Sequence, residues 1–114
     1  MTTRIMALLV ISIIGCSNTA SSQRSPLLTG LEGATLEIRG ACELASHKCV
    51  QCHPVERILR AGVDSPIHWK RYVTRMRLQP GSDISHREAD RITRCLVYRS
   101  FGDEGLSHLR GGAP

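Results

Sequence analysis

Two cysteines and a histidine stand close together in the segment Cys49-Val50-Gln51-Cys52-His53. Cysteines three positions apart at the end of a helix place both sulfur atoms on one side, and the imidazole that follows is a good iron ligand. This C-x-x-C-H pattern is the attachment signature of c-type haem. We therefore expect one covalently bound haem c, held by Cys49 and Cys52, with His53 as an axial ligand. A redox dithiol or half of a zinc site are the alternatives, but the chain shows neither a βαβ pattern nor a second pair of zinc ligands.

The iron of such a haem needs either a second axial ligand or an open site. Met76 is the only methionine outside the first six residues, and it follows His53 by 23 positions, enough for the chain to reach the other side of a haem. It also lies on a helical apolar stripe with Trp69 and Val73. We expect Met76 to bind the iron, with simple core packing as its alternative role. The rival ligands are His68, His86 and His108.

The N-terminal segment has the features of an export signal. Residues 5–14 are apolar and uncharged, but ten residues of helix span only about 15 Å, half of a bilayer core. Residues 1–15 therefore fit a signal peptide better than a spanning helix. Ile13-Ile14-Gly15-Cys16 resembles a bacterial lipoprotein box, so we expect a lipidated Cys16 that anchors an exported, periplasmic protein to a membrane. The alternative is an ordinary signal cut near Ala20.

Length and composition limit the rest of the chain to one domain. The protein has 114 residues, a length that excludes a multidomain enzyme or a β/α barrel. Its formal charge is +5. Residues 16–31 are rich in Ser, Thr, Gly and Pro and predict a flexible tether. Residues 32–102 form the expected folded domain, and the Gly-rich residues 103–114 the expected flexible tail.

Helical patterns fill the expected domain, and the strand signal is negligible. We expect helices over residues 35–48, 54–61, 65–78 and 85–100. Ser65-Pro66 has the pattern of an N-cap followed by proline, and Ser85 to Glu88 that of a capping box. The predicted inward positions are Leu36, Ala41, Leu44, Ala45, Ala89, Ile92 and Leu96. These patterns predict an all-α protein.

From about residue 33 to residue 101 the chain resembles a small monohaem cytochrome c. The matching stretches are CVQCHPVERI, the W-x-x-x-V-x-x-M pattern that ends at Met76, and GSDIS-x-x-E-A-D-x-I from Gly81 to Ile92. The resemblance is closest to the haem subunits of sulfite dehydrogenase-type oxidoreductases. It implies a cytochrome c fold, with three to four helices wrapped around one covalent haem, His/Met ligation and one-electron transfer.

The resemblance also implies roles for five further residues. Pro66 matches the proline whose carbonyl accepts the N–H of the proximal imidazole. Arg57 and Trp69 match donors to the haem propionates. The first and last helices of the fold cross near Cys42 and Cys95, which implies a disulfide there, with two free buried thiols as the alternative.

These expectations together describe a periplasmic one-electron carrier and not an enzyme. The alternatives are the haem subunit of an exported oxidoreductase complex and an open-site haem module that senses a gas. Arg71, Arg75 and Arg77 flank Met76 and suggest a redox partner protein with an acidic docking face. Nucleic acid is not an expected partner, because the protein is exported and lacks aromatic platforms.

Overall fold

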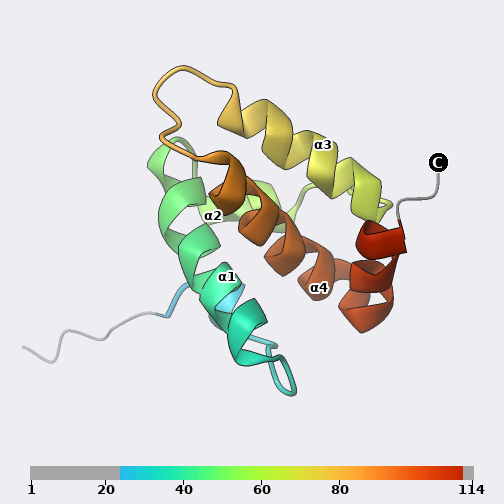
Figure 1. Ribbon diagram of the computed structural model, residues 1–114. Coiled ribbons are helices and arrows are strands. Elements are labelled where there is room, and N and C mark those ends of the chain that lie inside the picture. Colours follow the sequence, from blue (N-terminus) through green and yellow to red (C-terminus); the bar gives the residue numbers. More distant parts are fainter. Residues whose placement is uncertain (1–23, 112–114) are drawn as a thin grey trace, which may run out of the picture.

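The computed structural model describes residues 24–111, and within this range the chain is helical and contains no strand (Figure 1). The elements in chain order are the 3₁₀ turn η1 (Pro26–Leu28), α1 (Leu36–Lys48), the 3₁₀ turn η2 (Cys49–Gln51), α2 (Val55–Leu59), α3 (Pro66–Arg77) and α4 (His86–Gly111). The all-α class predicted from the sequence is confirmed for this part of the chain.

The helix starts follow the capping signals in the sequence. The Thr35 hydroxyl accepts a hydrogen bond from the Ile38 N–H at 3.2 Å and caps α1, and Ser65 caps α3 in the same way. At the start of α4 the Ser85 N–H donates to a Glu88 carboxylate oxygen at 2.8 Å, while the Glu88 N–H donates to the Ser85 hydroxyl at 3.2 Å. This reciprocal pair is the predicted capping box, and it fixes where α4 begins.

Helix α4 forms the centre of the molecule, with α1 against one side and α3 against the other (Figure 1). The inward positions predicted for α4, Ala89, Ile92 and Leu96, are buried. The prediction for Leu36 is wrong, because its side chain is 88% exposed. The predictions for Ala41 and Ala45 are confirmed, Leu44 is half-buried, and Ile38 and Cys42 complete the buried stripe of α1. These positions recur at helical spacing, and Leu36 at the first helical position falls off that face.

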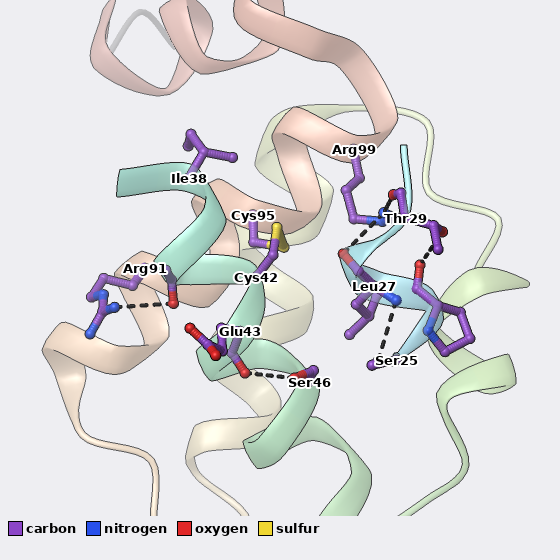
Figure 2. Close-up of a disulfide and its surroundings, with 12 residues drawn as sticks. Ser25, Leu27, Thr29, Ile38, Cys42, Glu43, Ser46, Arg91, Cys95 and Arg99 are labelled. Carbon is purple, nitrogen blue, oxygen red and sulfur yellow. Dashed lines mark hydrogen bonds between the residues drawn. A yellow bond between two sulfur atoms is a disulfide. The ribbon is translucent and has the colours of Figure 1, made fainter. Parts of the chain in front are cut away.

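A disulfide joins α1 to α4 where the two helices cross (Figure 2). Cys42 and Cys95 are both fully buried, and their Cα atoms are 5.0 Å apart. The same crossing is supported by Arg91, whose guanidinium donates to the Gly40 carbonyl at 3.2 Å. The disulfide therefore lies in the hydrophobic core and joins the helix that leads into the C-x-x-C-H segment to the helix at the centre of the fold.

The segment from 24 to 31 is part of the fold and not of a flexible tether, which corrects the boundary predicted from composition. Leu27 is fully buried and Leu31 is 5% exposed. The guanidinium of Arg99 donates to the carbonyl oxygens of Leu27, at 3.1 Å, and Thr29 (Figure 2). Two buried leucines offset the entropy of ordering this short stretch. The remainder of the predicted tether, with Cys16, lies outside the described residues.

The predicted flexible tail is also corrected, because residues 103–111 are helical. Gly102 adopts φ 63° and ψ −156°, a conformation that bends α4 and turns its last part back. Leu106 is then buried against the fold. Gly105 packs so closely on Phe101 that a Cβ added at Gly105 would lie 2.5 Å from the Cβ of Phe101. The glycines that suggested fraying are instead required by the bend and the close packing.

The Arg99 contacts predict a local effect of removing that guanidinium. We expect Arg99→Met to leave two backbone carbonyls without their donor and to destabilise the protein by about 1–3 kcal/mol. Limited proteolysis should show faster cleavage within residues 25–31, and denaturant unfolding should measure the loss. Arg87→Met, at an exposed arginine of the same helix, is the control and should change neither result. Equal cleavage rates in the two variants would contradict the assigned role of Arg99.

Candidate functional site

The four residues predicted to hold a haem line one cavity of about 270 Å³. Cys49, Cys52 and His53 come from the turn that follows α1, and Met76 comes from the last turn of α3. The other apolar or aromatic residues of the lining are Ile58, Tyr72, Val73, Ile84, Ile92 and Leu96. Polar residues of the lining are Lys48, Gln79 and Ser82. Residues that are far apart in the sequence therefore meet around one mostly apolar space.

The turn η2 positions the two thiols. The chain tightens from the α-helix into a 3₁₀ turn at Cys49, which leaves Cys49 half-buried and Cys52 exposed. His53 follows directly, and its Nδ1 atom lies 3.2 Å from the Pro54 carbonyl oxygen. Neither cysteine is part of a disulfide. The wall of the cavity is thus supplied with two thiols, one imidazole and one thioether.

This set of side chains fits a c-type haem. Two thiols can form thioether bonds, a neutral imidazole and a methionine sulfur are the axial ligands of many c-type cytochromes, and an apolar wall suits the porphyrin. Zinc fits less well, since no group of three or more His, Cys, Asp or Glu side chains within residues 24–111 could hold a metal ion. The donor chemistry around the cavity therefore matches haem better than zinc.

The protonation of Cys49 disfavours a redox dithiol. Burial raises the pKa of its thiol to about 11. Reactive cysteines need the opposite shift, because the thiolate is the nucleophile and active dithiols have a pKa lowered by a helix N-terminus or a nearby cation. A thiol that stays protonated at neutral pH is a poor catalyst of disulfide exchange.

None of the rival histidines lines the cavity. His68 lies on α3 beside Asp64, with 3.1 Å between its Nδ1 and a carboxylate oxygen, and this hydrogen bond lowers the pKa of Asp64. His86 is 79% exposed and 3.9 Å from Asp90. His108 is exposed as well. His53 is therefore the one histidine among the cavity residues, and Met76 the one methionine.

Three residues with expected haem contacts lie elsewhere. Trp69 is buried and its indole N–H donates to the Ser100 hydroxyl at 2.9 Å, so this donor points to α4. Arg57 is exposed on α2. Pro66 opens α3 and is not among the cavity residues, and the carbonyl next to the His53 ring belongs to Pro54. The structure brings none of the three to the cavity.

Sequence reasoning missed Lys48, which ties the loop after α3 to α1. Its side chain is 17% exposed, and its ammonium nitrogen lies 3.4 Å from carboxylate oxygens of both Asp83 and Glu88. Burial by itself lowers the pKa of Lys48, but the hydrogen bonds with Glu88 and Asp83 outweigh it and raise the pKa above its usual value. Lys48 is too far in the sequence from Asp83 and Glu88 for a helical or strand spacing to pair them. The contact follows only from the placement of α1 beside the 78–85 loop.

Tyr72 was also missed. It precedes Met76 by one helical turn and so shares its face of α3, and its ring packs edge-on against Trp69 with 5.6 Å between centroids. The signal was present in the sequence as the i, i+4 spacing of Tyr72 and Met76.

Comparisons with protein-family models, with curated proteins and with solved structures find no match to this chain. The interpretation of the site therefore rests on the residues of this chain and their arrangement. Among residues 24–111 no helix is long and apolar enough to cross a membrane.

Proposed function

We propose that the protein is a monohaem c-type cytochrome that carries single electrons. The observation that carries this proposal is the convergence of Cys49, Cys52, His53 and Met76 on one apolar cavity. When bound, the haem supplies the chemistry: its iron accepts or donates one electron as it changes between Fe(III) and Fe(II). The proposal includes a cytochrome c fold, in which α1, α3 and α4 enclose the haem.

Each cavity residue has a role in this proposal. Cys49 and Cys52 would hold the haem covalently through thioether bonds. His53 and Met76 would both bind its iron and leave no position for a substrate, so the proposed role is that of a carrier and not an enzyme. The apolar wall keeps water away and, together with the methionine sulfur, favours a high reduction potential.

A redox titration of the purified haem protein tests the proposal. We expect a single reversible one-electron step, the same in the reductive and oxidative directions. The reduced protein should not change its spectrum under carbon monoxide, because both axial positions are filled. A carbon monoxide complex in the wild-type protein would instead favour an open-site module that binds a gas.

We propose that Cys16 carries a lipid that anchors the protein on the periplasmic side of a membrane. Replacing Cys16 by serine should release the protein from membranes or leave its signal uncleaved. Fractionation and the mass of the mature N-terminus measure both outcomes. Ser12→Ala, a change within the predicted signal, is the matched control and should leave the protein in the membrane fraction. A mature chain that begins at or after Ala20 without a lipid would contradict the assignment.

A further inference from the structure

The outward side of α3 exposes apolar and basic side chains together. We define the α3 face as Ile67, Lys70, Arg71, Thr74, Arg75 and Leu78, which line one shallow hollow. Ile67 is 50% exposed and Leu78 is 65% exposed. At 3.6 residues per turn these positions lie on the side of the helix opposite to Trp69, Val73 and Met76. Ile67 and Leu78 thus add apolar surface at the two ends of a basic helix, and both line the same hollow.

The charged side chains of this face are all positive. Helix α3 contains no acidic residue, and within residues 24–111 no ion pair involves Lys70, Arg71 or Arg75. Two carboxylates lie at its margins. Asp64 is engaged by His68, and Asp90 lies in a second shallow cavity that Lys70 also lines. Within residues 24–111, Lys70, Arg71 and Arg75 therefore carry positive charges that are not engaged in an ion pair.

The α3 face adjoins the proposed haem cavity. The Arg75 guanidinium lies over the ring of Tyr72, 5.8 Å from its centroid, and Tyr72 lines the cavity. Gln79 lines both the cavity and the hollow of the α3 face. The α3 face therefore meets the haem cavity at one edge, at Tyr72 and Gln79, while the body of α3 lies between the rest of the face and Met76.

The face also points away from the side where the chain enters the fold. The first described residue, Arg24, precedes η1, which packs against α1, while α3 lies on the other side of α4 (Figure 1). From Cys16 to Arg24 there are eight residues, which span about 28 Å at most. An anchor at Cys16 would thus be attached on the η1 side of the fold, across α4 from the α3 face.

We propose that the α3 face docks an acidic protein, the partner that exchanges electrons with the haem. This inference rests on the proposed function and adds to it the location and the chemistry of the partner site. The arginines suit carboxylates of the partner, and Ile67 and Leu78 supply the apolar contacts that hold a docked complex. Arg77 is not part of the site, because it is half-buried and does not line the hollow of this face.

The test uses the purified full-length holoprotein and flavodoxin hydroquinone, an acidic soluble electron-transfer protein, as the probe. Each hydroquinone loses one electron to Fe(III) haem and becomes the semiquinone, and stopped-flow absorbance records the rate. At low ionic strength we expect the double variant Lys70→Glu, Arg71→Glu to react at least tenfold more slowly than the wild type, and the difference to vanish at high salt. Arg24→Glu, Arg87→Glu is the charge-matched control, at two exposed arginines outside α3 and its hollows, and should change the rate less than threefold.

Equal slowing in both double variants would show that net charge and not the α3 face guides the partner, and would overturn the proposal. A second arm places the lipidated protein in vesicles with and without phosphatidylglycerol. Protection of α3 from hydrogen exchange by this anionic lipid would show a lipid-binding face and would also overturn it. The proposed function is tested separately by the spectrum of the wild type. If that spectrum is of a His/Met haem while the α3 variants behave like the control, only the docking site is wrong.

Discussion

Replacing Met76 by leucine is expected to leave the haem covalently attached but to remove one of its axial ligands. Leucine keeps the volume of the side chain and so preserves packing, at a cost below about 1.5 kcal/mol. The loss of the thioether should turn a low-spin iron into a high-spin one, abolish the weak near-infrared band of sulfur-to-iron charge transfer, and permit binding of carbon monoxide. The reduction potential should fall by on the order of 0.1 V, within the roughly 0.8 V range that axial ligands span.

Optical spectra and a redox titration of wild type and variant measure these changes. His68→Ala and His86→Ala are the matched controls, because both histidines lie outside the cavity. They should retain the wild-type spectrum and potential. A near-infrared band that persists in the Met76 variant, or one that disappears in a histidine variant, would show that Met76 only packs in the core.

Removing the disulfide is expected to cost more stability than any single substitution discussed above. Cys42 and Cys95 are 53 positions apart, and closing a loop of that length restricts the unfolded chain by about 4 kcal/mol, within the usual range of roughly 2–5 kcal/mol. We expect Cys42→Ala, Cys95→Ala to lower the free energy of unfolding by that amount. Both positions are fully buried, so alanine also leaves a small void in the core.

Denaturant unfolding, followed through the haem absorbance, measures the loss. Wild type with its disulfide reduced should unfold at about the same denaturant concentration as the double variant, which separates the effect of the bond from that of the void. Alkylation in denaturant without a reductant should label neither cysteine in the haem protein. Two labelled thiols under those conditions would contradict the pairing.

The sequence could predict the parts of the fold that depend on local signals. The caps at Thr35, Ser65 and Ser85 act over three or four residues, and each helix begins at the expected position within one residue. The C-x-x-C-H pattern and the single methionine after residue 6 singled out Cys49, Cys52, His53 and Met76, and these four residues do line one cavity. These features could be predicted without knowing which residues pack against them.

Other features depend on contacts between distant parts of the chain, and the sequence did not reveal them. Residues 24–31 have the composition of a linker, but Leu27 and Leu31 are buried and Arg99 bonds their segment from 70 or more positions away. The glycines at 102 and 105 suggested fraying, while the structure uses them for a bend and a close contact. The partner of the Trp69 indole, Ser100, and the partners of Lys48 likewise lie on other elements.

The most direct test of the central claim is the intact mass of the purified protein, together with the absorption spectrum of its alkaline pyridine haemochrome. We predict a mass equal to that of the mature chain plus one haem, which survives denaturation and acid extraction, and a haemochrome of the type with two thioether links. The Cys49→Ala, Cys52→Ala variant should have neither. A wild-type protein that is produced with the c-type haem attachment machinery, and that still has the mass of the bare chain with two alkylatable thiols at Cys49 and Cys52, would contradict the account.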